Sequence, residues 1–217
     1  MRTLRLAATG LISASALAGI SLSSGPASGA PSSLSLAGCT TAIGAQEYAK
    51  GTLTVATDNP VHTPWFVNNK PANGKGFESA VAYAIAKVLG VAKSNVKWVY
   101  EPFDSSYAPG PKKFDFDINE VSFTADRAKV VTFSSSYYDV QQSIVALKTN
   151  AIVAKHSQAQ LKTYQYGDQI GTTGLAYIYN FIKPTKPARV YNTLDQAVAA
   201  LQNRQIDALV IDTPTGQ

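Results

Sequence analysis

The sequence predicts an α/β fold, and two kinds of segment support this prediction. Short runs rich in β-branched residues, such as Gly51–Thr57 and Ile206–Ile211, are typical of strands. Segments with apolar residues at helical spacing, such as Phe77–Leu89 and Leu194–Asn203, are typical of helices. These strands and helices alternate along the chain, and such alternation indicates an α/β architecture.

The first half of the chain contains three expected strands and one long helix. The helix covers Phe77–Leu89, and Gly90 is a typical residue to end it. The segment Asp104–Lys113 contains a Pro-Gly-Pro sequence, so no long helix can run through it. The expected strands are Gly51–Thr57, Val96–Tyr100 and Phe114–Val121.

The second half repeats the alternation. A strand is expected at Ser143–Leu147, and a short helix within Lys148–Lys162. The small residues Gly171–Gly174 open a further helix, which continues to about Phe181. The remaining expected elements are a strand at Ala188–Tyr191, a helix at Leu194–Asn203 capped by Thr193, and a buried strand at Ile206–Ile211 that ends in Asp212.

Composition limits the possible functions. The 217 residues suit one large domain or two small ones. The chain has 19 Lys and Arg residues against 14 Asp and Glu, and the remaining positive charge is evenly spread, so no nucleic-acid partner is expected. His62 and His156 lie far apart without a neighbouring Cys, so no metal site is expected. No glycine-rich phosphate-binding pattern occurs, and no cofactor is expected.

Residues 1–39 are interpreted as a signal peptide. Arg2 and Arg5 form a positive amino-terminal region, and an apolar run over Leu6–Ile20 follows. The segment Leu36–Cys39 resembles the lipobox of bacterial lipoproteins, in which the Cys becomes the lipidated first residue, so Cys39 is the predicted lipid anchor to the membrane. The alternative is an ordinary secretory signal cut near Ala30. Both place the protein outside the cytoplasm, with residues 40–50 as a tether.

The segment from Phe114 to Lys148 carries a polar cluster at a strand end. Ser122, Thr124 and Arg127 follow the expected strand, and hydroxyls with a guanidinium suit a carboxylate ligand. The alternative is a capped helix with a surface ion pair. Thr173, at a helix start, suits an anion or simple capping, and Asp212 suits a turn or a ligand ammonium.

Four segments together resemble the family 3 extracellular solute-binding proteins, the polar amino-acid class that serves ABC importers. The first is Gly51–Asp58, and the second is Gly76–Glu78 followed by Ala84–Gly90. The third is Phe123–Arg127 with Val131–Ser134 and Tyr137–Tyr138. The fourth is Gly171–Thr173 with Ala199–Leu201 and Ile206–Asp212. The resemblance extends from about residue 50 to the end, and the order and spacing of the segments strengthen it.

The resemblance implies a two-lobe periplasmic-binding-protein-like fold of type II, with a ligand between the lobes. Lobe 1 is expected at residues 51–146 and lobe 2 at 147–217, with Ser143–Leu147 as the first crossing between them. The implied function is capture of a polar amino acid and its delivery to an ABC permease in the membrane, without catalysis. A monomer is expected.

The resemblance also implies roles for individual residues. Arg127 would bind the α-carboxylate of the ligand, with Ser122 and Thr124 beside it and Thr173 reaching it from lobe 2. Asp212 would pair with the α-ammonium. Phe103 and either His62 or Trp65 would sandwich the ligand, and Asp58 and Glu120 would contact its amine or side chain. The surplus of acids favours a cationic or amide side chain.

The sequence departs from the family pattern at several positions. Ala80 replaces an Asp after Gly76–Glu78, and Ser136 replaces a Pro before the tyrosines. Asp126 stands for Glu before Arg127, and the loop with His62 and Trp65 differs from the usual aromatic pattern. The chain also stops soon after Asp212, so a C-terminal truncation with an incomplete lobe 2 is expected.

Two other functions stay open at this point. Cyclohexadienyl or arogenate dehydratases resemble the same family, and Glu120 or Glu78 would then serve as a general acid. A sensor domain of a membrane receptor is the second alternative.

Overall fold

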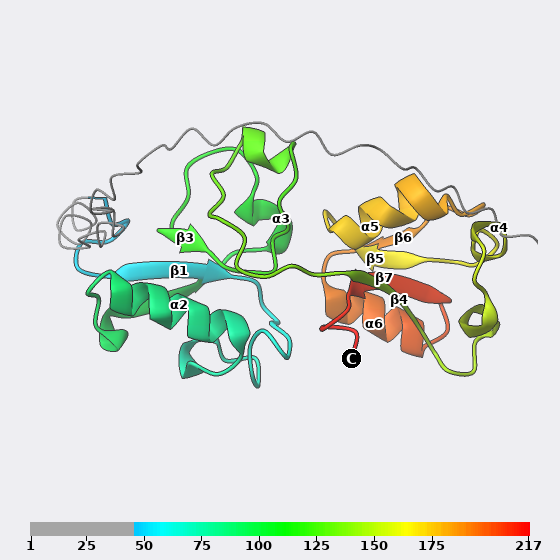
Figure 1. Ribbon diagram of the computed structural model, residues 1–217, viewed down its shortest axis with the longest axis horizontal. Coiled ribbons are helices and arrows are strands. Elements are labelled where there is room, and N and C mark those ends of the chain that lie inside the picture. The colour runs from blue at the N-terminus through cyan, green and yellow to red at the C-terminus, as the bar shows by residue number, and fades with distance from the viewer. Residues whose placement is uncertain (1–45) are drawn as a thin grey trace, which may run out of the picture. The chain divides into compact units, whose positions relative to one another are not determined.

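The computed structural model describes residues 46–217. The predicted signal peptide, Cys39 and residues 40–45 of the tether lie outside these described residues. The first half contains the elements β1 (Leu53–Thr57), η1 (Pro71–Asn73), α2 (Phe77–Val88), η2 (Lys93–Asn95), β2 (Val96–Tyr100), α3 (Phe103–Ser106), β3 (Phe116–Asp117) and η3 (Arg127–Lys129), drawn in Figure 1.

The first sheet is parallel and has the order β2-β1-β3. All five residues of β1 are buried, which explains their continuous apolar and Thr character. Helix α2 runs beside this sheet (Figure 1), and its Ala82 and Ala86 share a core cluster with Leu53, Val55 and Phe66. The predicted helix and the predicted strand Val96–Tyr100 are therefore confirmed.

The third strand is much shorter than the sequence predicts. A strand over Phe114–Val121 was expected, but only Phe116 and Asp117 pair with β1. The carboxylate of Asp115 accepts hydrogen bonds from the N–H groups of Thr54 and Tyr48, both at 2.6 Å, and takes a place that a strand carbonyl would occupy. Glu120 then adopts a positive φ of 54°, which turns the chain out of the strand.

The second half contains the elements β4 (Gln142–Ala146), η4 (Ala151–Ala154), α4 (Gln158–Leu161), β5 (Gly167–Gln169), α5 (Thr173–Tyr177), the π-helical turn η5 (Ile178–Ile182), β6 (Arg189–Tyr191), α6 (Leu194–Gln202) and β7 (Ala208–Asp212). Strands β4 and β7 are antiparallel, and β5 and β6 are parallel. A parallel bridge between Tyr166 and Ala208 connects the two pairs.

Alternating residues of β7 face two separate core clusters. Ala208 and Val210 belong to the cluster that contains Leu175 of α5, whereas Leu209 belongs to the cluster that contains Ala197 of α6. This is the period of two that a strand imposes on its side chains. Helices α5 and α6 accordingly lie on opposite faces of the second sheet (Figure 1), which makes it an α/β/α sandwich.

Two local signals of the second half act as the sequence predicts. The Thr193 hydroxyl accepts a hydrogen bond from the N–H of Gln196 at 3.3 Å and caps α6. Strand β4 lies at the expected position and pairs with β7 along its length, from Gln142 opposite Asp212 to Ala146 opposite Ala208. The lobe boundary at residues 146 and 147 stays a prediction. Within residues 46–217, no helix is long and apolar enough to cross a bilayer.

Candidate functional site

Polar side chains from three strands and the loops that follow them gather around a cavity of about 80 Å³. Asp58 follows β1, Asp168 lies in β5, and Asp212 ends β7. Side chains at the carboxyl ends of parallel strands are exposed together at one edge of a sheet, which is where α/β proteins commonly bind ligands. The cavity is lined by Asp58, Pro60, Val61, His62, Phe103, Asn119, Glu120, Gln142, Asp168, Gln169, Thr172, Thr173, Gly174, Thr193, Leu194, Val210, Ile211, Asp212 and Thr215.

We call this cavity the acidic cavity, because its lining combines several acidic side chains with no Lys or Arg among the described residues. Asp58, Glu120, Asp168 and Asp212 line it, and among the described residues no Lys or Arg does. No group of three His, Cys, Asp or Glu side chains in residues 46–217 has an arrangement that could hold a metal ion. The cavity therefore offers several carboxylates to an organic cation.

Burial makes these carboxylates reluctant to ionise. It raises the pKa of Asp168 to about 7 and the pKa of Asp212 to about 6. Burial, followed by the charge of Glu78, raises the pKa of Glu120 well above its ordinary range. Burial also raises the pKa of Asp58. A bound cation would favour the ionised forms and reverse these shifts.

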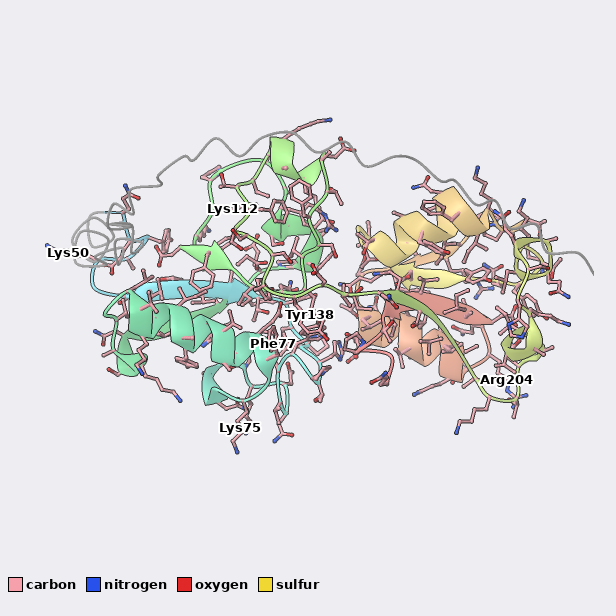
Figure 2. All side chains as sticks on the ribbon, viewed as in Figure 1. Lys50, Lys75, Phe77, Lys112, Tyr138 and Arg204 are labelled. Atoms are coloured by element: carbon pink, nitrogen blue, oxygen red, sulfur yellow. The ribbon has the colours of Figure 1, made fainter. Side chains whose placement is uncertain are left out.

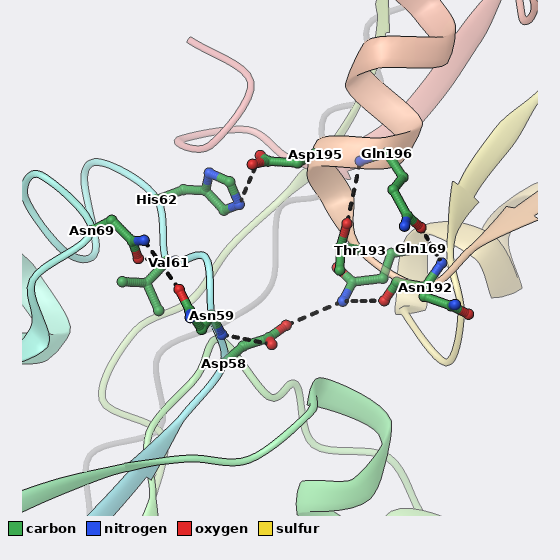
Figure 3. A network of polar contacts seen from close by, with 10 residues as sticks. All are labelled: Asp58, Asn59, Val61, His62, Asn69, Gln169, Asn192, Thr193, Asp195 and Gln196. Carbon is green, nitrogen blue, oxygen red and sulfur yellow. Dashed lines mark hydrogen bonds and ion pairs between the residues drawn. The ribbon is translucent and has the colours of Figure 1, made fainter.

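A network of polar contacts connects the loop after β1 to β5 and α6 (Figure 3). The Gln169 amide donates to Asp58 Oδ2 and to the carbonyl of Asn192, both at 3.3 Å. The N–H of Asn59 donates to the other Asp58 oxygen at 2.7 Å. His62 Nε2 lies 3.7 Å from Asp195 Oδ1 at the start of α6. Asp58 is thus oriented by donors on both of its oxygens.

Two threonines at the start of α5 line the cavity, and the first of them also caps the helix. The Thr172 hydroxyl accepts a hydrogen bond from the N–H of Leu175 at 3.1 Å, so Thr172 is the N-cap residue. Thr173 lines the cavity, and its hydroxyl accepts a hydrogen bond from the Gln142 amide at 3.1 Å. The same amide donates to Asp212, so Gln142 connects Thr173 and Asp212.

Arg127 lies apart from the acidic cavity. Its side chain is buried, its Nη1 donates to the Ser122 carbonyl at 2.6 Å, and its Nη2 donates to the Gly171 carbonyl at 2.8 Å. The Thr124 hydroxyl accepts the N–H of Arg127 at 3.1 Å. The guanidinium carbon lies 4.3 Å from the centre of the Tyr107 ring. The structure therefore groups Ser122, Thr124 and Arg127 as the sequence predicts, but with protein carbonyls as acceptors.

The aromatic candidates fall into two groups. Phe103 and His62 line the acidic cavity, whereas Trp65 lines a neighbouring one. Trp65 is buried, and its Nε1 donates to the Thr215 hydroxyl at 2.7 Å. That hydroxyl donates to Glu120 Oε2 at 2.9 Å, so Trp65 and Glu120 both position the chain that follows β7.

Sequence reasoning missed several lining residues. Asp168 is an acid inside a buried strand, a pattern that signals function because an acid is costly there. Asn119 Nδ2 and Gln142 Oε1 are buried and have no hydrogen-bond partner among the described residues. Both side chains line the cavity, so they offer one amide donor and one acceptor to a ligand.

Two bacterial binding proteins are similar to this chain in sequence. The chain is 32% identical over 160 residues to a probable histidine-binding protein of Campylobacter jejuni, covering 69% of this chain and 59% of the relative. It is 30% identical over 158 residues to an arginine-binding periplasmic protein of Mannheimia haemolytica, covering 71% of this chain and 61% of that relative. The chain thus spans about three fifths of the length of these relatives.

Solved structures agree with the sequence comparison. A mutant of arginine-bound ArgBP from T. maritima superposes with a TM-score of 0.66 at 28% identity, covering 81% of this chain and 78% of that one. An ancestral amino acid-binding protein, described as a precursor of cyclohexadienyl dehydratase, gives a TM-score of 0.67 at 28% identity, covering 82% and 76%.

The family model described as bacterial extracellular solute-binding proteins, family 3, matches residues 53–209. This match extends from the first residue of β1 into β7, and the structural relatives confirm the expected periplasmic-binding-protein-like fold of type II. The chain belongs to the bacterial extracellular solute-binding proteins of family 3.

Proposed function

We propose that this protein is the extracytoplasmic substrate-binding component of an ABC importer, and that it captures a cationic amino acid in the acidic cavity. The observation that carries the choice of ligand is the set of four lining carboxylates without a lining Lys or Arg among the described residues. The names of the histidine-binding and arginine-binding relatives agree with it.

The charges of the ligand match the groups available. A cationic amino acid has two positive groups, and each gains charge-assisted hydrogen bonds from a carboxylate. In this proposal Asp212 binds the α-ammonium, while Asp58 and Asp168 face the cationic side chain, with Glu120 beside them. Phe103 and His62 pack against the side chain. Water leaves the cavity as the ligand enters, which strengthens each of these contacts.

The ligand carboxylate requires a rearrangement at Arg127. The guanidinium now donates to the carbonyls of Ser122 and Gly171, and the Gly171 carbonyl must release Nη2 for a carboxylate to bind there. Thr173 lies two residues beyond Gly171, on the first turn of α5. Groups before β4, such as Arg127 and Asp58, and groups from β5 onward, such as Asp212, would then hold the same ligand, and this gives a closed conformation its differential affinity.

A thermal-shift screen against the twenty amino acids tests the proposed ligand class. We expect arginine, lysine or histidine to stabilise the protein, by about 2.7 kcal/mol at 100 times the dissociation constant, because a ligand stabilises the state that it binds. The double variant Asp58→Asn/Asp168→Asn should lose this shift, whereas the exposed control Asp139→Asn should keep it. A larger shift with glutamate than with arginine would contradict the proposal.

The cellular setting is part of the same proposal. The protein acts as a monomer, delivers its ligand to a membrane permease, and is anchored through a lipid on Cys39. Fatty-acid labelling of cells that express the chain and its Cys39→Ser variant tests the anchor, since only the first should take up label. If both variants are labelled equally, lipidation at Cys39 is wrong.

The predicted alternatives are tested separately. The relative described as a dehydratase precursor is itself described as an amino acid-binding protein, which supports binding as the function. We expect no turnover of prephenate or arogenate by the purified protein, and turnover that depends on Glu120 would favour the enzyme. A transmembrane receptor segment in the same gene product would favour the sensor.

A further inference from the structure

A second cavity lies next to the acidic cavity and has a different character. Its volume is about 360 Å³, within the range of small-molecule sites. It shares Glu120 and Asp212 with the acidic cavity, but aromatic rings form much of its wall. We call it the aromatic cavity, and its defining residues are Trp65, Glu78, Tyr137 and Tyr138.

Glu78 gives this cavity an unsatisfied carboxylate. It lies in the first turn of α2, and its side chain is fully buried. Its Oε1 accepts hydrogen bonds from the N–H of Glu120 at 2.8 Å and from the Tyr137 hydroxyl. Its Oε2 is buried and has no hydrogen-bond partner among the described residues. A buried carboxylate oxygen without a donor is costly, so a donor from a ligand would be stabilising.

No protein cation compensates for this charge. Among the described residues, no Lys or Arg lines the aromatic cavity, whereas Glu120 and Asp212 add two further carboxyl groups. Burial raises the pKa of Glu78 to about 7, and the hydrogen bonds from Tyr137 and Glu120 oppose this effect only in part. A positively charged ligand would favour the ionised form of Glu78.

The aromatic rings around Glu78 also suit a positively charged ligand. The Trp65 and Tyr138 rings meet edge to face with their centres 5.0 Å apart. The ring centres of Phe77 and Tyr138 are 5.3 Å apart, and both residues are labelled in Figure 2. The Tyr137 and Tyr138 side chains are 44% and 46% exposed, so a ligand from solvent can reach them. Faces of aromatic rings attract organic cations within about 6 Å.

We propose that the aromatic cavity binds a primary alkylammonium ion, which donates to Glu78 Oε2 and packs its carbon chain against Trp65 and Tyr138. This site is distinct from the proposed amino-acid site although the two share Glu120 and Asp212, because Glu78 and Trp65 line only the aromatic cavity. The free acceptor on Glu78 requires an N–H donor, which a quaternary ammonium lacks. The described residues offer no metal-binding group of three His, Cys, Asp or Glu side chains.

Calorimetry with n-butylammonium at pH 8 tests the site. The unaltered protein should bind it, and Glu78→Gln should weaken binding at least tenfold, because a hydrogen bond to a charged acceptor is lost. Gln retains an oxygen for the N–H of Glu120, so the fold should persist. The control Glu101→Gln lies outside both the acidic and the aromatic cavity and should bind as the unaltered protein does. Tetramethylammonium should bind at least tenfold more weakly than n-butylammonium.

Two further variants keep the result interpretable. Ser135 is exposed and lines the aromatic cavity, so Ser135→Phe should block binding without touching Glu78, even if Glu78→Gln fails to fold. Asp168→Asn alters only the acidic cavity and should leave n-butylammonium binding intact while it weakens arginine binding. Equal binding to the unaltered protein and Glu78→Gln overturns the proposal. Binding of arginine without any binding of n-butylammonium also overturns the proposal, but it does not contradict the proposed import function.

Discussion

Replacing Asp168 by Asn should stabilise the ligand-free protein at pH 8 while weakening its affinity for a cationic ligand. Asp168 is 1% exposed in the middle of β5, and burial raises its pKa from 3.8 to about 7. Between these two pKa values the folded protein binds a proton that the unfolded chain has lost. The stability contributed by this group therefore falls as the pH rises from about 4 to about 7, and it stays low above that.

The size of the effect follows from the shift. A difference of about three pKa units corresponds to roughly 4 kcal/mol of unfolding free energy, taken as an upper bound. Asn cannot ionise, but it has one carbonyl oxygen where Asp168 accepts hydrogen bonds from the N–H groups of Gln169 and Val210. The loss of one of these bonds costs about 1 kcal/mol. We therefore expect a net stabilisation of at most about 3 kcal/mol at pH 8.

Urea unfolding at pH 5 and pH 8 measures this difference. The unaltered protein and the exposed control Asp139→Asn should both lose stability between pH 5 and pH 8. Asp168→Asn should lose less, by the contribution of this one group, because Glu78 and Asp212, whose pKa values are also raised, still titrate. Calorimetry at pH 8 should also show arginine binding at least tenfold weaker in Asp168→Asn. If all three proteins show the same change with pH, Asp168 does not carry the proton, and the electrostatic description of the cavity is wrong.

Two further substitutions test the packing at α5 and the role of Arg127. Gly174→Ala would place a Cβ 1.8 Å from the Val210 carbonyl oxygen, which belongs to the backbone and cannot move aside. We therefore expect at least about 2 kcal/mol of destabilisation in urea unfolding. A stability within about 0.5 kcal/mol of the unaltered protein would show that α5 and β7 are not in close contact. Arg127→Ala should abolish the thermal shift with arginine if the guanidinium binds the ligand carboxylate, and a retained shift would mean that Arg127 only bonds the Ser122 and Gly171 carbonyls.

Local patterns predict most of the fold. Strand β2 and helix α6 depend on β-branched residues, apolar spacing and a Thr193 cap, all of which are visible in sequence. Strand β3 is shorter than predicted because both of its limits depend on the fold. Just before the strand, the Asp115 carboxylate accepts the hydrogen bond of the Thr54 N–H, and after it Glu120 turns the chain away with a positive φ. The hydrogen bond between Thr54 and Asp115 joins residues that are 61 positions apart in the chain, so no local pattern reveals it.

The candidate site is predictable where it follows strand ends. Asp58 and Asp212 are correctly expected at such ends, and both line the acidic cavity. Arg127 does not line that cavity, and two of its donors bind carbonyls that only the folded chain brings near, so its role toward a ligand stays a prediction. Glu78 shows the same limit, since its unsatisfied oxygen depends on its burial rather than on its neighbours in sequence.

The most direct test of the central claim is calorimetry of arginine binding between pH 8 and pH 5. Cation capture by buried carboxylates requires their ionised forms, and the pKa values of Asp168 and Asp212 are raised to about 7 and about 6. Affinity should therefore fall at least tenfold from pH 8 to pH 5. Near pH 6.5, binding should release protons to the buffer. Affinity that is unchanged or higher at pH 5 would contradict the account.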